Sequence, residues 1–378
     1  MKKSLLGLVV CSLILMIVYR FPVVRGNMRY SMEIIYRIAI AVILVGVTWQ
    51  FNRYMAAFLG LALFSQFYPV LGHASARAFY NVVCGVVLYV ILVQYGKDWS
   101  VHLLNMLCVV ALLHTFFIIL QVVEIRLLWQ NSGGTITGIM ENQNSSAALA
   151  ALCLPAFLRR KWHWFSILIL FALFASKSSG GMIAALIGLS FYTTVIVKDK
   201  RYLFPIGMGI VIIGAIFVIF FDMYQSFDIR LSAWSKAIEL YPQHWLTGCG
   251  LGRWKNEFAA LVFANHLSPE VIAKNFHPVF MADTFPQGFI RLHSSLFQTL
   301  IEMGIGFAVI LGGYLLNIGK RSWGNLAQLA IPLTALIIIL ANGSINFLIR
   351  IAPNATIVII WLAIMEIELC RVAKLRDT

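Results

Sequence analysis

The apolar run YLFPIGMGIVIIGAIFVIFF at residues 202–221 leads directly into a hydrophilic segment that begins DMYQSFDIRLSAWSKAIEL at residues 222–240. The hydrophilic segment continues to His293, and a second apolar run then covers residues 294–318. About 20 apolar residues suffice to cross a membrane as a helix. A long polar insertion between two such runs predicts a small ordered subdomain at a membrane surface, because the bilayer interior does not tolerate these polar groups.

The composition of the whole chain points the same way. Hydrophobic residues make up 61% of the 378 residues and charged residues only 12%. A soluble domain is roughly 45–50% apolar and about 25% charged, so the composition indicates an integral membrane protein. Long unbroken apolar runs, in place of alternating segments of about ten residues, favour an all-α fold. The six cysteines show no metal-binding spacing and are interpreted as small buried hydrophobic residues.

Twelve apolar segments predict about 12 transmembrane helices with one large loop between the ninth and the tenth. The sixth and seventh segments are short and poorly separated, which leaves eleven as the alternative count. The segments lie near residues 4–19, 34–51, 54–71, 79–95, 101–123, 145–158, 163–177, 180–197, 202–221, 294–318, 325–347 and 351–370.

The basic residues of the short loops and tails decide the orientation. With twelve helices, fifteen basic residues fall on the side of the two termini, and eight fall on the other side outside the long loop. Since cytoplasmic loops carry the excess of Lys and Arg, both termini are expected in the cytoplasm and the long loop outside. The predicted organisation is residues 1–221 with helices 1–9, a loop subdomain at residues 222–293, and residues 294–378 with helices 10–12.

The kind of basic residue also differs between the two sides. The outer side has ten Arg and four Lys when the long loop is included, whereas the cytoplasmic side has seven Arg and eight Lys. Arginine presents a planar and permanently charged fork that suits a phosphate. Contact with lipid headgroups would explain any single arginine equally well. As a group, these residues indicate an anionic ligand on the outer face, with Arg253 and Arg291 among the candidates.

The middle of the long loop contains the glycine run Gly248-Cys249-Gly250-Leu251-Gly252. This run lacks the strand, the helix and the acidic residue of a dinucleotide site. One interpretation is a tight loop corner that requires positive φ or a close backbone approach. The other is a binding role, in which bare amides such as that of Gly250 face a phosphate or a sugar.

Three residues near the ends of the loop are candidates for chemistry. Arg230 begins a segment whose apolar residues recur at helical spacing, which predicts an amphipathic helix along the membrane edge; its side chain points either into the protein or into water. His293 lies directly before the tenth segment, where a histidine serves as a general base near neutral pH or caps a helix. Glu302 lies inside that segment, and intramembrane carboxylates usually have a partner that supports a site.

Two further outer turns carry weaker candidates. Ser176-Lys177-Ser178-Ser179-Gly180-Gly181 joins the seventh and eighth segments and combines a cation with hydroxyls and bare backbone. Gly138-Ile139-Met140-Glu141-Asn142-Gln143-Asn144 precedes the sixth segment, and its amide side chains, including that of Asn142, can bind sugar hydroxyls or cap a helix.

In this order, the features resemble the O-antigen ligase and O-antigen polymerase superfamily of bacterial envelope glycosyltransferases. They are an Asn-containing turn, a Ser/Lys/Gly hairpin, a long loop with Arg-x-x-x-Trp, Tyr-Pro and spaced glycines, and a final His-Ser-x-x-x-Gln followed by Glu302-x-Gly304. The resemblance covers roughly Gly138 to Gly304. Together with the twelve-helix plan it implies a GT-C-like all-α integral membrane fold for the whole chain.

The resemblance implies transfer of a glycan from an undecaprenyl-pyrophosphate carrier to an acceptor hydroxyl at the periplasmic face of the inner membrane. The acceptor would be lipid A core for a ligase or another carrier-linked glycan for a polymerase, and a protein hydroxyl is a third option within the group. Arg230 matches the loop arginine assigned to the pyrophosphate, and His293 matches the histidine thought to activate the acceptor.

One motif departs from the family pattern. The outer hairpin of many members reads Ser-Arg-Gly, whereas this chain reads Ser178-Ser179-Gly180. The second phosphate contact is therefore open, and Lys177, Arg291 or Arg253 could replace the missing arginine.

The implied reaction requires few catalytic groups. The carrier pyrophosphate is already a good leaving group, so no cofactor and no nucleic-acid partner is expected besides the two substrates and membrane lipids. Fixed cations would stabilise the phosphates and the developing charge, and one histidine would deprotonate the hydroxyl. The outer loop has no DxD-type carboxylate pair, which fits a metal-independent reaction. One base without a nucleophilic carboxylate predicts direct displacement with inversion.

The alternative is a multispan secondary transporter or flippase for a lipid-linked or anionic substrate. Twelve helices favour this class of protein. However, residues 1–190 and 191–378 show no convincing repeat, and the sequence indicates no acidic or histidine relay and no paired Gly/Pro-broken helices within the spans. The glycosyltransferase is therefore the preferred prediction.

Overall fold

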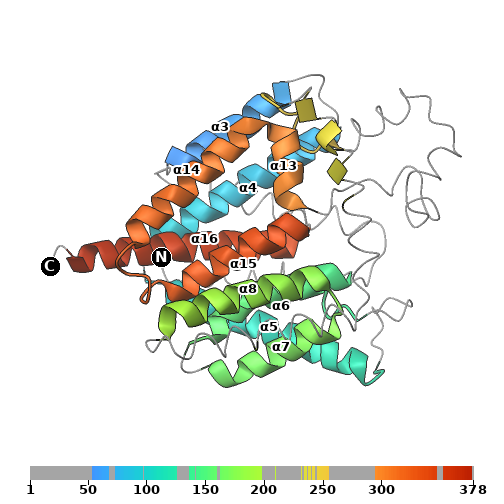
Figure 1. Cartoon of the computed structure of the whole chain (residues 1–378), viewed down its shortest axis with the longest axis vertical. Coiled ribbons are helices and arrows are strands. Elements are labelled where there is room, and N and C mark those ends of the chain that lie inside the picture. The colour runs from blue at the N-terminus through green and yellow to red at the C-terminus, as the bar shows by residue number, and fades with distance from the viewer. Residues whose placement is uncertain are drawn as a thin grey trace, which may run out of the picture. The chain divides into compact units, whose positions relative to one another are not determined.

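The computed structural model describes residues 53–67, 73–96, 98–125, 136–140, 142–159, 162–197, 245–254, 294–346 and 352–376, with single positions between 209 and 242. Every regular element in these residues is helical, which confirms the all-α prediction for them. In chain order the helices of Figure 1 are α3 (Arg53–Phe67), α4 (His73–Tyr95), α5 (Ser100–Val122), α6 (Gln143–Phe157), η1 (His163–Phe165), α7 (Ser166–Ala175), α8 (Ser179–Ile196), α13 (Ser295–Met303), α14 (Ile305–Ser322), α15 (Ala330–Ile345) and α16 (Ala352–Arg376).

The predicted apolar segments correspond well to these helices. The sixth and seventh, which looked poorly separated, are distinct helices α6 and η1–α7. The tenth was expected as one continuous run, but the backbone breaks it at Gly304, whose φ of 67° ends α13 before α14 begins. The first, second and ninth segments lie outside the described residues, apart from a helical position at 209.

By length and apolar composition, α5 and α8 are the two described helices that could each cross a membrane. Shorter apolar stretches occur in α3, in α4, across η1 and α7, and in α15. The count of twelve spans, the orientation and the three-segment organisation stay predictions.

The chain forms two compact units. The first contains residues 1–50, 87–221 and 321–378, and the second contains residues 51–86 and 222–320. The boundaries fall within α4 and α14, so these two helices continue from one unit into the other. Each unit has its own core.

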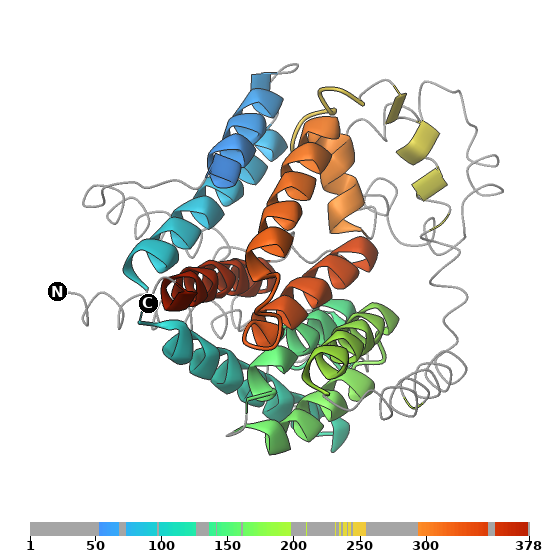
Figure 2. The same ribbon diagram turned by 60° about the vertical axis from the view of Figure 1, so that its left-hand side comes forward.

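Helix α6 forms the centre of the first unit. It packs against α5, α7, α8, α15 and α16, and Figures 1 and 2 show α6, α8 and α15 side by side. Its side chains from Ser145 to Phe157 are all buried. Small residues allow the close approach, since a Cβ on Gly181 of α8 would overlap Ala147 of α6. Close contacts through small residues are typical of helices that pack in a membrane.

The second unit is built around α3, α13 and α14. Buried Ala62, Leu251, Met303 and Phe307 form its apolar cluster, with further hydrophobic side chains packed against them. Leu251 comes from the glycine run, so this part of the long loop is part of the core of the unit.

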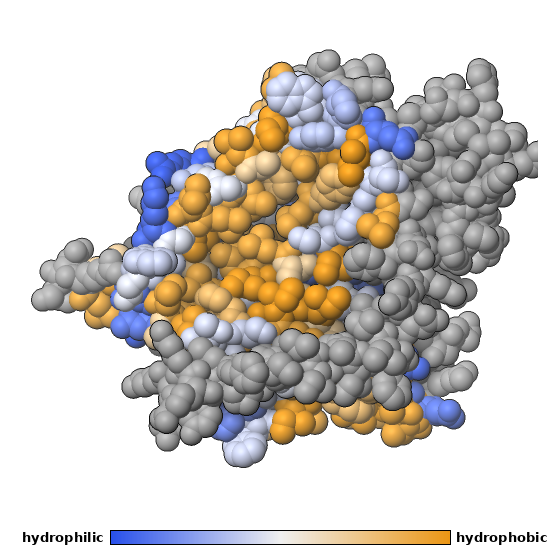
Figure 3. Space-filling model, in the orientation of Figure 1, coloured by the Kyte–Doolittle hydropathy of each residue, from blue (hydrophilic) through white to orange (hydrophobic). Residues whose placement is uncertain are grey.

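Large apolar side chains also cover much of the described surface, as the face in Figure 3 shows. In the second unit they include Phe64, Val309 and Leu316, of which Leu316 is 68% exposed. Water would disfavour so many exposed hydrophobic groups, whereas lipid chains would not. This surface agrees with the membrane nature indicated by the composition.

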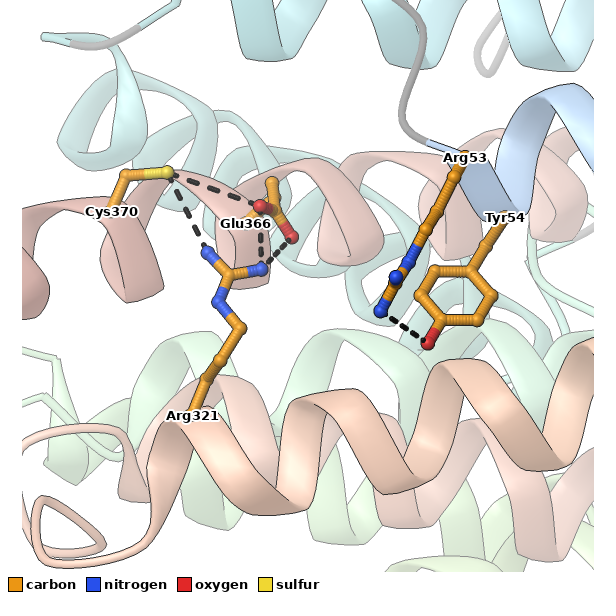
Figure 4. A network of polar contacts seen from close by, with 5 residues as sticks. All are labelled: Arg53, Tyr54, Arg321, Glu366 and Cys370. Atoms are coloured by element: carbon orange, nitrogen blue, oxygen red, sulfur yellow. Dashed lines mark hydrogen bonds and ion pairs between the residues drawn. The ribbon is translucent and has the colours of Figure 1, made fainter.

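Two polar contacts at helix ends are drawn in Figure 4. The Nη1 of Arg321 donates to both carboxylate oxygens of Glu366, at 2.7 and 3.0 Å, and its Nη2 lies 3.7 Å from the Sγ of Cys370. This contact ties the end of α14 to α16 within the first unit. In the second unit, Arg53 lies over the ring of Tyr54 and donates to its hydroxyl at 3.1 Å.

Candidate functional site

The glycine run docks on the break between α13 and α14. The amides of Cys249 and Gly250 donate to the carbonyl oxygens of Ile301 and Glu302, at 3.0 and 2.9 Å. The amide of Ile305 donates in return to the carbonyl of Trp245 at 2.7 Å. A helix leaves its last carbonyls without intrahelical partners, and the glycine run supplies partners for two of them at the end of α13.

Glu302 is the buried acid of this junction, with an exposed fraction of 0%. Its Oε2 accepts from the amide of Gly252 at 2.8 Å, and its Oε1 accepts from the side-chain Nε2 of Gln298 at 2.8 Å. The partner that an intramembrane carboxylate was predicted to need is therefore a backbone amide of the glycine run. Glu302 joins the loop to α13 through both its side chain and its carbonyl.

The glycines are required by backbone geometry at this point. Gly248, Gly250 and Gly252 all have positive φ, and a Cβ on Gly248 would overlap the carbonyl of Glu302. This agrees with the tight-corner interpretation of the run. It also corrects the idea that the amide of Gly250 faces a ligand, because in the structure that amide is donated to Glu302. That Gly250 lies near the substrate stays a prediction.

The packing of Gly248 against Glu302 predicts that an added side chain at position 248 strongly destabilises the protein. Gly248→Ala should lower the free energy of unfolding by about 3 kcal/mol, because it combines positive φ with overlap against backbone atoms. The melting temperature of the purified protein in detergent measures this. Gly312→Ala is the matched control, since a Cβ there meets nothing within 4 Å and alanine favours a helix. Equal melting temperatures for the two variants would contradict the docking of the glycine run.

Arg253 follows the glycine run directly. Its amide donates to the carbonyl of Gly250 at 3.1 Å, and its side chain is half-buried. The next residue, Trp254, is among the largest fully buried side chains. The backbone at Arg253 is therefore held firmly by the turn before it and the tryptophan after it.

An aromatic contact joins the start of the long loop to its end. The rings of Trp234 and Phe297 meet edge to face with their centroids 6.4 Å apart. Trp234 lies in a segment whose described positions from 231 to 242 are helical, in agreement with the predicted amphipathic helix. Phe297 belongs to the first turn of α13, where its amide donates to the Oγ of the N-cap Ser294 at 3.2 Å. Trp234 is the tryptophan of the Arg-x-x-x-Trp motif, whereas Phe297 had no predicted role in a site.

In the first unit, Lys177 lies at the tip of the hairpin between α7 and α8. Its side chain is exposed and its φ is 51°, a left-handed conformation that glycine adopts more easily than lysine. The neighbours on both sides are buried and bonded to α6. Ser176 Oγ lies 3.0 Å from Ser146 Oγ, and Ser178 Oγ donates to Asn144 Oδ1 at 2.8 Å. The exposed ammonium group of Lys177 therefore lies on a hairpin that hydrogen bonds hold against α6.

Asn142 is the N-cap of α6, and its side-chain oxygen accepts from the amide of Ser145 at 2.8 Å. The capping interpretation of this residue is thus confirmed. The turn before it is tied to α5, because the Oε1 of Gln121 accepts from the amides of Thr137 and Gly138 at 2.8 and 2.9 Å.

A buried histidine connects the Asn142 turn with the Lys177 hairpin. His114 on α5 is 0% exposed. Its Nδ1 accepts from the amide of Ile139 at 3.3 Å, and its Nε2 lies 3.1 Å from Ser146 Oγ. The hydrogen bonds around this histidine involve only serine hydroxyls and backbone groups, so the absence of an acidic or histidine relay in the spans stays a prediction. The network ends at the carbonyl of Ala172 and includes no carboxylate, so it does not resemble the acidic relay of a proton-coupled transporter.

The other predicted site residues, Arg230, Arg291 and His293, lie outside the described residues. Lys177 and Asn142 belong to the first unit, and Gly250, Arg253 and Glu302 belong to the second. Within the second unit the structure brings together Gly250 and Glu302. Within the first unit it joins the Lys177 hairpin and the Asn142 turn through α6. In the part of the chain that the structure describes, no group of His, Cys, Asp and Glu side chains could hold a metal ion.

Comparison with known proteins adds a family. Residues 164–311 match the family model described as O-antigen ligase. The match includes α7, α8, the glycine run, α13 and the start of α14, and it begins after Asn142. No curated protein matches the chain.

The match covers fewer than half of the residues of the chain, and it agrees with the O-antigen ligase and O-antigen polymerase superfamily that the sequence features resemble. The similarity of residues 164–311 to this family supports an O-antigen ligase/polymerase-type glycosyltransferase activity in general.

Proposed function

We propose that this protein transfers a glycan from an undecaprenyl-pyrophosphate carrier to an acceptor hydroxyl at the periplasmic face of the membrane. Arg230 binds the pyrophosphate and His293 removes the proton of the acceptor hydroxyl. The acceptor is lipid A core if the protein is a ligase, or a carrier-linked glycan if it is a polymerase. The reaction proceeds without a metal ion and inverts the anomeric centre.

The contact between Trp234 and Phe297 is the observation that carries this proposal. Trp234 follows Arg230 by four residues, and Phe297 follows His293 by four residues. The contact brings the start of the long loop near its end, and this supports the proposal that the residues next to the two rings serve one site.

The dipole of α13 and the contacts of Glu302 also bear on the proposal. The N-terminus of α13 carries the positive end of the helix dipole and follows His293 directly. Positive potential there would favour a pyrophosphate and the charge that develops on it as the anomeric C–O bond breaks. Glu302, at the other end of α13, is fully buried and bonded to Gln298 and Gly252. We propose that Glu302 holds α13 and the loop together and does not itself contact substrate.

Lys177 is our candidate for the cation that replaces the missing hairpin arginine. A lysine at a left-handed position costs backbone energy that a glycine would avoid. The hydrogen bonds of Ser176 and Ser178 hold the hairpin in place, and binding of a phosphate by the exposed ammonium would explain why position 177 is a lysine and not a glycine. Arg253 and Arg291 remain the other candidates, and Asn142 is reassigned to capping α6.

Purified full-length protein in nanodiscs tests the proposal when it is supplied with undecaprenyl-pyrophosphate-linked glycan and either lipid A core or a second carrier-linked glycan. Product on lipid A core would identify a ligase, and lengthened carrier-linked glycan would identify a polymerase. Addition of EDTA should leave the rate unchanged. Transport of the donor across proteoliposomes without any new glycosidic bond would contradict the proposal and favour the transporter.

The same reaction in oriented membranes tests the side of the active site. Intact spheroplasts, which expose the periplasmic face, should glycosylate an impermeant acceptor added from outside. Inverted inner-membrane vesicles should not. Activity only in the inverted vesicles would overturn the predicted topology, including both cytoplasmic termini.

A further inference from the structure

The Asn142 turn and the Lys177 hairpin of the first unit are both connected to the buried side chain of His114. The amide of Ile139 donates to its Nδ1 at 3.3 Å, so Nδ1 is unprotonated and the ring proton lies on Nε2. That Nε2–H faces Ser146, with 3.2 Å to the carbonyl oxygen and 3.1 Å to Oγ. The ring therefore accepts from the turn before α6 and donates toward α6 itself.

The hydrogen bonds of Ser146 and Ser176 determine which group donates and which accepts along a series that begins at His114. Ser176 Oγ donates its only proton to the carbonyl of Ala172 at 2.7 Å. In the 3.0 Å contact between the two hydroxyls, Ser146 must then be the donor and Ser176 the acceptor. Ser146 Oγ, having used its own proton, is left to accept from His114. The chain runs from the ring through Ser146 to Ser176, the residue before Lys177.

The ring of His114 is closely packed against its neighbours. A Cβ on Gly138, whose φ is 57°, would overlap the ring of His114. The ring and the hydroxyl groups of Ser146 and Ser176 are buried in the first unit, where a lost hydrogen bond cannot be replaced by bulk water. Movement of the ring would thus shift both the Asn142 turn and the Lys177 hairpin.

We infer that His114 is a positioning residue for substrate binding, which fixes the Lys177 hairpin relative to α6 through the Ser146–Ser176 hydrogen-bond chain. The inference rests on the proposed function, because it assumes that Lys177 contacts the carrier pyrophosphate. The histidine itself touches no substrate and takes no part in proton transfer.

A double-mutant cycle in nanodiscs, with undecaprenyl pyrophosphate as the probe, tests the connection to Lys177. Ser146→Ala should weaken binding about tenfold, which corresponds to ~1.4 kcal/mol and is typical of one lost buried hydrogen bond. Adding Ser146→Ala to Lys177→Ala should have no further effect on the Kd, because the ammonium to be positioned is then absent. Multiplicative effects would overturn the inference, since Ser146 would then act independently of Lys177.

Two substitutions of the histidine separate hydrogen bonding from packing. His114→Gln keeps one acceptor and one donor and should bind undecaprenyl pyrophosphate nearly as well as wild type. His114→Phe keeps a ring without either group and should bind about tenfold more weakly. The reverse order would show that the ring only fills space. His102→Gln, on the exposed face of the same helix, is the matched control and should be unchanged.

A measurement without ligand distinguishes the inference from the proposed function. Hydrogen exchange at the amides of residues 176–181 should become faster in Ser146→Ala and His114→Phe, and stay unchanged in His114→Gln. Unchanged exchange in all three would overturn the positioning role. If exchange responds but Lys177→Ala binds undecaprenyl pyrophosphate as well as wild type, the phosphate contact of Lys177 is refuted, and a role of His114 in substrate binding is refuted with it.

Discussion

Arg230→Lys should reduce glycan transfer by about 100-fold while expression and melting temperature stay unchanged. An ammonium keeps the charge, but it cannot form the two parallel hydrogen bonds by which a guanidinium holds a phosphate. The interaction also has to stabilise charge on the leaving pyrophosphate, where fixed donors have their largest effect. Initial rates with undecaprenyl-pyrophosphate-linked glycan measure the change, and Arg230→Ala should be at least as poor.

The control for this prediction comes from the same segment. Lys236 is another cation six residues further on, and Lys236→Ala should transfer glycan at close to the wild-type rate. A similar loss in Lys236→Ala would mean that general positive charge, and not a specific fork, is needed. Near-normal transfer by Arg230→Ala would reduce Arg230 to a surface residue and remove the basis for its match to the family arginine.

Sequence patterns located most described helices because long apolar runs end at polar residues. The expected segments at 101–123 and 180–197 agree with α5 (Ser100–Val122) and α8 (Ser179–Ile196) to within one residue at each end. The same reasoning missed the break at Gly304. Hydropathy is unbroken from α13 into α14, and it carries no information on a backbone torsion that glycine alone adopts easily.

Contacts between distant residues were the main part of the site that the sequence could not reveal. The pairing of Glu302 with Gly252 joins residues fifty apart, and the contact of Trp234 with Phe297 joins residues still further apart. His114 lies in a largely apolar helix and its partners are distant in the sequence, so only the fold reveals its contacts with the Asn142 turn and with α6. Gly138 was a usable signal, because a glycine before a helix cap often marks a close approach.

These contacts support the proposed placement of function at the ends of α13. The C-terminal end is occupied by the glycine run, whose amides complete the hydrogen bonding of the helix. The N-terminal end has the aromatic contact and follows His293 directly. A helix fixed at one end and packed through an aromatic ring near the other is a rigid support, which a general base needs in order to stay within hydrogen-bond reach of its substrate.

His293→Ala should therefore reduce transfer to the acceptor by about 10²–10⁴-fold, the usual contribution of a general base. The Kd for undecaprenyl pyrophosphate should stay close to wild type, because in the proposed mechanism Arg230 binds the donor and His293 does not. His293→Gln should be as inactive as the alanine variant, since an amide can hydrogen-bond a hydroxyl but cannot take its proton. The wild-type rate should fall in acid, because a protonated imidazole accepts no further proton.

Alanine variants of two other histidines in the loop distinguish loss of a catalytic base from loss of the loop fold. His266 and His277 belong to the same loop but lie further from α13 in the sequence, so their alanine variants should transfer glycan at close to the wild-type rate. Equal losses in all three variants would indicate collapse of the loop and not removal of a base. An active His293→Ala protein whose rate depends on pH as in wild type would remove His293 from the mechanism. The contact between Trp234 and Phe297 would then support donor binding by Arg230 alone.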